Sequence, residues 1–327
     1  MKKILSLILT IILASLLVLS FASCKKDKGD DTKADVNVSV LNGTTGFGMA
    51  YLMEENANGN ASNNYTFSVE TDASVISKGL INGSIDIAAL PTNAASVLYN
   101  KPNSPVKIIA INTLGVLYLV ENGSSVNSIS DLQGKTIYCP ANNPAYIMQY
   151  LLNKNNINAT IDTTYSTPAL LNQAVSSGAL NSENVIAVLP EPVLTTAMKD
   201  NSSLSVRLDL TEEWNKVEST QLVQGCVVVR TEYLNNNPDA VNKFLAEYKE
   251  SIEYLQVNVS SAADLIVKHN IFANKNVAEI AIPKCNVTYM DGQEMKTAMN
   301  GFLTAMSTVD ISSIGGTIPD DAFYYIQ

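Results

Sequence analysis

The segment from Leu41 to Gly48, with the sequence LNGTTGFG, has the residue types of a loop that binds a small solute. A helix is predicted directly behind it, and backbone N–H groups at a helix start can hold phosphate or another anion. The spacing of these glycines argues against a nucleotide-binding loop, because they do not form the dinucleotide-binding motif G-x-G-x-x-G. The only other candidate, Gly134-Lys135-Thr136, has Ile129 where a P-loop needs its first glycine.

Small hydroxyl and amide side chains recur in the other loops that follow predicted strands. The carboxyl ends of strands in an open α/β sheet lie at one edge, so we expect these loops to line one solute cleft. Such side chains and free helix-start amides can bind a neutral or singly charged solute. Ordinary turn and cap chemistry is the alternative for each of them. The predicted ligand-binding residues are Thr44, Thr45, Gly46, Thr92, Asn93, Asn112, Thr113, Asn142, Asn143, Glu191 and Trp214.

Two of these residues have a specific chemistry to offer. Glu191 is the only carboxylate in the loops and could accept an amine or a ring N–H of the solute. Its alternative role is that of an acid favoured by the dipole of the following helix. Trp214, the only tryptophan, could be a stacking wall for a flat solute or a buried packing residue.

The N-terminus predicts export and lipid attachment. Lys2 and Lys3 precede a short apolar run that ends in small residues before Cys24. This is the pattern of a secretory signal over residues 1–23, and the Ala-Ser-Cys ending resembles a bacterial lipobox, with Cys24 as the lipidated residue. An uncleaved membrane anchor is the alternative. Residues 24–35 have no large apolar side chain and are predicted to form a flexible tether.

Composition argues against several functions. A formal charge of −10 with only two arginines, Arg207 and Arg230, does not suit nucleic-acid binding or tight recognition of a doubly charged anion. The single histidine, His269, ends a predicted helix, and the cysteines lack metal-ligand spacing. We therefore expect no metal, no cofactor and no enzymatic activity.

Apolar strands alternate with helical segments in two rounds, which predicts parallel strands in an α/β fold with two lobes. Residues 36–116 and 229–327 are expected in lobe 1, and residues 117–228 in lobe 2. The extended stretches VLYLVE and CVVVR are expected to be the crossings between them. Thr167-Pro168 predicts a helix start and Gly178 its C-terminal cap.

Three segments carry a family resemblance: LINGSIDIAALPTNAASVLY, SISDLQGKTIY and VVVRTEYLNNNPDAVNKFLAEYKESIEY. From Val36 onwards the chain resembles ABC-transporter solute-binding lipoproteins with the type II periplasmic-binding fold. It is most similar to the nitrate/sulfonate/taurine and thiamine-precursor binding group. The resemblance implies two doubly wound sheets joined by crossing strands, C-terminal helices, and a solute clamped between the lobes.

The implied function is an extracytoplasmic receptor on the outer face of the bacterial cytoplasmic membrane. Its partners would be a membrane permease and a small solute, and it would act as a monomer. Glu191 and the amide-rich loops favour a nitrogen heterocycle or amine, with an alkyl sulfonate as the second candidate. An enzyme on the same fold acting on a pyrimidine or related metabolite is the alternative. It would need a Schiff-base lysine, and no lysine falls in the candidate loops.

The three cysteines that follow Cys24 lie in a compartment where disulfides form. Cys226 begins the strand that returns to lobe 1, and Cys285 lies in a turn between late helices of that lobe, so we predict a disulfide between them, with Cys139 free. Two separate buried thiols are the alternative.

Overall fold

A computed structural model describes residues 33–103, 105–180 and 184–326, and residues Ala34–Gln327 form one compact unit. The predicted signal peptide, Cys24 and most of the predicted tether lie outside the described residues. Asp35, which we placed in the tether, is already the first residue of a strand. Within the described ranges, no helix is long and apolar enough to cross a membrane.

The larger of two sheets has the strand order β11-β4-β10-β3-β1-β2, and the lobe built around it is called lobe 1. Strands β1, β2 and β3 run parallel, whereas β10 and β11 pair antiparallel with their neighbours. The sheet is therefore mixed, although the helix–strand alternation predicted parallel strands. Its strands are β1 (Asp35–Leu41), β2 (Asn64–Glu70), β3 (Ile87–Pro91), β4 (Val106–Leu114), β10 (Val223–Arg230) and β11 (Val287–Met290).

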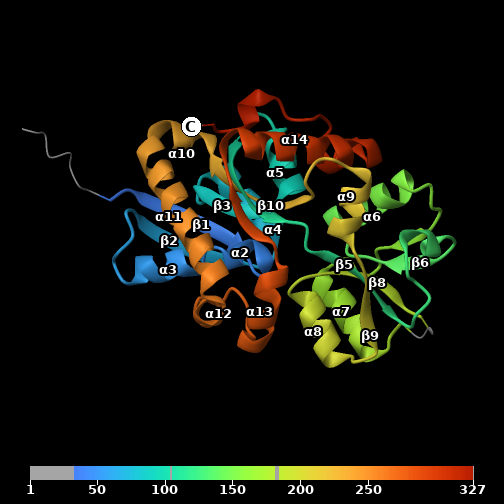
Figure 1. Ribbon diagram of the computed structural model, residues 1–327. Helices are drawn as coiled ribbons and strands as arrows, with labels where there is room; N and C mark the ends of the chain where they lie inside the picture. Colours follow the sequence, from blue (N-terminus) through green and yellow to red (C-terminus); the bar gives the residue numbers. More distant parts are fainter. Residues whose placement is uncertain (1–32, 104, 181–183, 327) are drawn as a thin grey trace, which may run out of the picture. The chain divides into compact units, whose positions relative to one another are not determined.

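Helices cover both faces of this sheet because alternate side chains of its strands point to opposite faces. One buried cluster joins α3, α11 and α12 to the sheet, and another joins α4 and α5 to its other face. Figure 1 shows α11 and α3 beside β1 and β2. The helices of lobe 1 are α2 (Thr44–Phe47), α3 (Ala50–Ala57), α4 (Ala73–Asn82), α5 (Thr92–Tyr99), α10 (Thr231–Asn236), α11 (Pro238–Val257), α12 (Val259–Lys268) and α13 (Lys275–Ala281).

The smaller sheet, the centre of lobe 2, has the order β7-β6-β8-β5-β9. Here β5 is the antiparallel strand between β8 and β9. Its strands are β5 (Leu117–Asn122), β6 (Thr136–Tyr138), β7 (Thr160–Asp162), β8 (Ile186–Pro190) and β9 (Leu204–Asp209). Its helices are α6 (Asn143–Lys154), α7 (Pro168–Ser177), α8 (Val193–Asp200) and α9 (Leu210–Val217).

Helix α7 shows how the local sequence sets the boundaries of an element. The Thr167 hydroxyl accepts the N–H of Leu170, Pro168 occupies the first turn, and Gly178 ends the helix in the left-handed region at φ 72°. All three features were predicted from the residue types, because each one satisfies a free backbone group or avoids needing one.

The crossings between the lobes differ from the prediction. All of VLYLVE except Val116 lies in β5 of the smaller sheet, and CVVVR forms most of β10 in the larger one. Residues 223–228, expected in lobe 2, therefore belong to lobe 1. The crossings are the short segments 115–116 and 218–222, which carry too few residues to show a pattern in the sequence.

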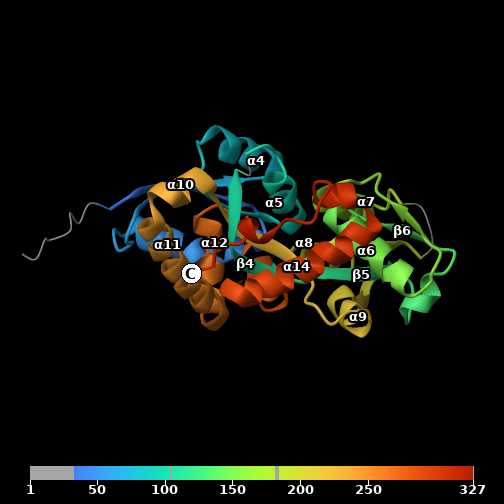
Figure 2. The same ribbon diagram turned by 90° about the horizontal axis from the view of Figure 1, so that it is seen from above.

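Helix α14 (Gly292–Val309) contacts elements of both lobes. It follows β11 of lobe 1, packs on α6 of lobe 2, and is followed by a 3-10 turn that contacts α5. Figure 2 shows α14 alongside α6. A single buried apolar cluster accordingly contains residues of both lobes, including Trp214 and Phe302, whose rings lie 5.9 Å apart.

The predicted disulfide is wrong. Cys139, Cys226 and Cys285 are free, buried thiols. Cys226 lies in the cluster that contains α5 and α14 residues, whereas Cys285 lies in the cluster on the α11 side. The two side chains therefore occupy different faces of the larger sheet, which prevents a bond that needs Cα atoms within about 7 Å and facing Cβ atoms.

Candidate functional site

Two hydrogen bonds join the lobes at the edge of the sheets where the predicted loops lie. The first is made by Thr44, at the start of α2, whose hydroxyl donates to the carbonyl oxygen of Glu191 at 2.6 Å. Both residues are buried, and Glu191 follows β8 directly. A loop of lobe 1 thus meets a loop of lobe 2 without an intervening residue.

The second bond links Thr92, at the start of α5, to Asn143, at the start of α6. The Thr92 hydroxyl donates to the carbonyl oxygen of Val223 at 3.1 Å, so its lone pair is left to accept the Asn143 amide N–H at 3.2 Å. This polarity fixes the orientation of the Asn143 amide. Asn143 Oδ1 then has no hydrogen-bond partner within the described residues, although it is buried. We call Thr44, Thr92, Asn143 and Glu191 the jaw residues.

The Glu191 carboxylate is already occupied inside lobe 2. One oxygen accepts the Thr195 hydroxyl at 2.9 Å and the other accepts the Thr195 N–H at 3.1 Å. Glu191 therefore has the role given above as its alternative, that of an acid at the start of the following helix. Burial raises the pKa of Glu191, and the bonds from Thr195 only partly offset the increase.

Asn112, Thr113 and Gly46 lie behind the jaw residues. The Asn112 amide donates to the Thr45 carbonyl and to Tyr248 Oη, and the Thr113 hydroxyl donates to Asn112 Oδ1. A Cβ at Gly46 would lie 2.5 Å from the Leu41 carbonyl oxygen. These residues hold the α2 loop in place, and their polar groups are committed within lobe 1.

Thr45, Asn93 and Asn142 are the predicted residues whose side chains remain available. Thr45 and Asn93 are half-buried, Asn142 is exposed, and none of the three side chains makes a hydrogen bond within the part of the chain that the structure describes. Asn142 has φ 64° and ψ −129°, a positive-φ conformation outside the left-handed helical region in which asparagine is common. It caps α6 immediately before Asn143.

Trp214 is not part of this site. It is 0% exposed, its ring packs on Tyr150 and Phe302, and its Nε1 donates to the Thr220 carbonyl at 2.6 Å. The packing alternative is therefore correct. Helix α9 places Trp214 between α6 and α14, a position that the sequence around it does not reveal.

Three residues near the jaw residues were missed. The Tyr118 hydroxyl of lobe 2 donates to the Lys284 carbonyl of lobe 1 at 3.4 Å, and Cys285 Sγ lies 3.6 Å from the Thr44 hydroxyl. Burial raises the pKa of Cys285 to about 12, so it is present as a thiol. The Lys284 side chain is exposed. We considered the turn from Pro283 to Asn286 only for the disulfide, and nothing in its sequence indicates that the turn lies beside Thr44.

No three His, Cys, Asp or Glu side chains of the described residues come together in a way that could hold a metal ion. His269, the only histidine, contacts Glu54 with Nε2 at 3.0 Å on the α12–α3 side of lobe 1. It has no part in the jaw contacts.

The fold and the position of these loops agree with a match to a family model. The model described as NMT1/THI5 like matches residues 71–260, and the chain belongs to this family. The expected resemblance to solute-binding proteins of the type II periplasmic-binding fold is confirmed at the level of family and fold.

Solved structures have the same fold over nearly their whole length. An ABC transporter from Parabacteroides distasonis is similar with TM-score 0.71 and 23% identity, over 90% of this chain and 99% of that one. The periplasmic aliphatic sulphonate binding protein SsuA from Escherichia coli gives TM-score 0.71 and 14% identity, over 90% and 93%. The alkanesulfonate-binding protein SsuA from Xanthomonas axonopodis pv. citri, bound to MOPS, gives TM-score 0.64 and 12% identity, over 88% and 96%. A comparison with curated proteins found no match.

Proposed function

We propose that the protein is the extracytoplasmic solute-binding receptor of an ABC importer, which closes its two lobes on a small organic solute. The observation that carries the proposal is the pair of direct hydrogen bonds between the lobes, Thr44 to Glu191 and Thr92 to Asn143. They lie where ligands collect in open α/β sheets. Membership of the NMT1/THI5-like family and the transport proteins among its structural neighbours support the same role.

Lobe closure without solute leaves a buried acceptor without a partner. Each hydrogen bond between the lobes contributes about 0.5–1.5 kcal/mol net, whereas such an unpaired acceptor, Asn143 Oδ1, costs about 1–3 kcal/mol. A solute that supplies a donor to this oxygen removes the cost and shifts the population towards the closed form. A permease could then distinguish the loaded receptor from the empty one.

The polar groups of the site favour a solute with N–H groups, a nitrogen heterocycle or an amine. Asn143 Oδ1 takes over the role that we first gave to Glu191, whose carboxylate is bound to Thr195. Thr45, Asn93 and Asn142 can add donors or acceptors. An alkyl sulfonate, whose charged group has only acceptor oxygens, leaves Asn143 Oδ1 unpaired and is the second candidate.

An enzyme on this fold is less well supported. Lys284 lies near Glu191, but its side chain is exposed, and a Schiff-base lysine needs a desolvated or electrostatically lowered amine. His269 is committed to Glu54 on another side of lobe 1. We therefore propose a receptor without catalysis, held at the membrane by a lipid on Cys24 and delivering its solute to a permease.

Native mass spectrometry of residues 34–327, purified without denaturation from cells grown in rich medium, tests the proposal. This range has its own hydrophobic core and forms one compact unit. We expect a 1:1 complex with a small nitrogen-containing molecule, and thermal stabilisation when that molecule is added back. If the protein converts the bound molecule to a product, it is an enzyme and the receptor proposal is wrong. If the retained molecule is a sulfonate, the proposed class of nitrogen-containing solutes is wrong.

A further inference from the structure

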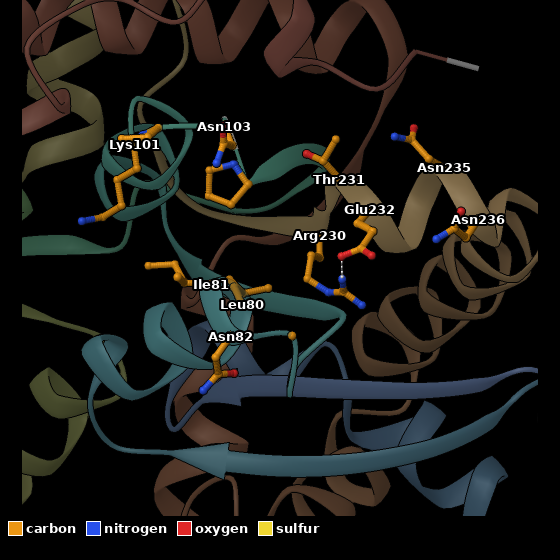
Figure 3. Close-up of a pocket in the computed structure, with 13 residues that line it drawn as sticks. Leu80, Ile81, Asn82, Lys101, Asn103, Arg230, Thr231, Glu232, Asn235 and Asn236 are labelled. Carbon is orange, nitrogen blue, oxygen red and sulfur yellow. Dashed lines mark hydrogen bonds and ion pairs between the residues drawn. The ribbon is translucent and has the colours of Figure 1, made fainter.

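A pocket of about 770 Å³ lies in lobe 1, at the opposite ends of the sheet strands from the jaw residues; Figure 3 shows its lining side chains. Arg230, in its wall, ends β10 and pairs with Val106 at the start of β4. Gly225, near the other end of β10, pairs with Pro91 and Thr113 beside the jaw residues. At about 3.3 Å per residue, roughly 17 Å of strand separate the two places. The pocket is therefore not part of the interlobe site.

The guanidinium of Arg230 is held in a fixed orientation. Its Nη2 donates to Asp86 Oδ1 at 2.9 Å, and its backbone N–H donates to the Asp86 carbonyl at 2.8 Å. Asp86 is 4% exposed, and its other carboxylate oxygen accepts the backbone N–H and the side-chain amide of Asn37. The buried carboxylate thus positions the cation before any ligand arrives.

The other side of the guanidinium already binds a carboxylate that is free to move. Nη1 of Arg230 donates to Glu232 Oε2 at 2.7 Å, as the dashed line in Figure 3 shows. The Glu232 side chain is 76% exposed, so its bond to arginine is weak and easily exchanged. A carboxylate is the group that a guanidinium binds best, and Glu232 occupies the place that an external carboxylate would take.

The rest of the wall combines apolar surface with a second cation. Leu80 and Ile81, from the last turn of α4, belong to the pocket wall; Ile81 is exposed, whereas the Leu80 side chain is fully buried behind it. Lys101 also lines the pocket and is exposed on a flexible stem; in Figure 3 its ammonium group points away from Arg230. An apolar wall between two cations suits an organic acid better than an inorganic anion, because a pocket of this size holds a small molecule with an apolar body.

We propose that this pocket is a second ligand site, for a small carboxylic acid with a short apolar chain. The carboxylate replaces Glu232 on Nη1 of Arg230, Lys101 adds a second positive charge, and the chain lies against Ile81. The site does not depend on the solute-receptor function, because it shares no residue with the jaws.

Titration of residues 34–327 with hexanoate, followed by proton–nitrogen NMR spectra, tests the site. The chain has two arginines, so Arg207 provides an internal reference for the side-chain Nε–H signal of Arg230. We expect hexanoate to shift the signals of Arg230, Leu80 and Thr231 but not that of Arg207. Hexanamide, its neutral isostere, should shift none of them.

Two variants sharpen the test without breaking the Arg230–Asp86 pair. Glu232→Gln removes the competing carboxylate and should tighten hexanoate binding by about threefold to tenfold, whereas Lys101→Gln should weaken it by about threefold. The proposal is overturned by equal responses to hexanoate and hexanamide, by shifts centred on Thr44 and Asn143, by no shift at Arg230, or by unchanged affinity in Glu232→Gln.

Discussion

At the scale of single residues, Glu191 uses its carboxylate and its backbone carbonyl for two different contacts. Its side chain binds Thr195 inside lobe 2, and its carbonyl accepts the Thr44 hydroxyl of lobe 1. The sequence predicted the position of Glu191 at the cleft, but not which of its oxygens faces the other lobe. Backbone and side-chain oxygens of one residue point in different directions, and the tertiary structure decides which one is used.

The raised pKa of Glu191 gives a prediction for stability against pH. Because burial makes protonation easier in the folded state, the folded protein binds this proton more tightly than the unfolded chain does. The stabilisation is therefore complete below the unfolded pKa of about 4.3 and is lost as pH rises through the raised folded pKa.

The substitution Glu191→Gln should remove this loss. Thermal unfolding should show the variant gaining stability relative to the unsubstituted protein as pH increases from about 4 to 7, since glutamine stays neutral and can still accept from Thr195. Glu253→Gln, an exposed position on α11, is the matched control and should follow the unsubstituted protein. Parallel curves for Glu191→Gln and its parent would contradict the account of this residue.

At the scale of elements, α14 explains how the second crossing is held. A Cβ at Gly301, in the middle of this helix, would lie 2.5 Å from the Thr220 methyl group and 2.8 Å from Thr220 Cβ. Thr220 belongs to the crossing 218–222, and its carbonyl accepts Trp214 Nε1. Glycine within a helix costs about 1 kcal/mol in stability relative to alanine. Here the close approach of the crossing explains why position 301 is glycine.

The substitution Gly301→Ala should therefore destabilise the protein, although alanine favours helix. We expect a loss of about 1–3 kcal/mol in the free energy of unfolding, measured by urea denaturation, because the crossing has to move. Asn300→Ala, an exposed neighbour on the same helix, should be neutral or slightly stabilising. A stabilised Gly301→Ala variant would show that the crossing is not held against α14.

The elements that the sequence predicted well are those whose signals are local. The caps of α7 and the apolar strands β1, β3 and β8 follow from residue types and spacing. The crossings, the place of Trp214 and the separation of Cys226 from Cys285 depend on which face of a sheet a helix covers. That choice is made by packing between residues far apart in the chain, and no short window contains it.

At the scale of the whole folded unit, the two lobes are joined both by apolar packing and by the jaw contacts. The α14–α6–α9 cluster consists of many buried apolar side chains, so we expect it to persist when the jaws separate. The jaw residues make two hydrogen bonds between the lobes, and the unpaired Asn143 Oδ1 offsets part of their stabilisation. A solute can therefore decide between the open and closed forms with a few contacts of its own.

The most direct test of the clamp is calorimetric titration of the solute identified by native mass spectrometry into three variants and the unsubstituted protein. Asn142→Ala and Asn143→Ala should each weaken binding by about threefold to tenfold, since each removes about one hydrogen bond at 1.4 kcal/mol per decade. Asn153→Ala, an exposed position at the other end of α6, should bind like the unsubstituted protein. Equal affinity in all four proteins would contradict a solute held between Thr44, Thr92, Asn143 and Glu191.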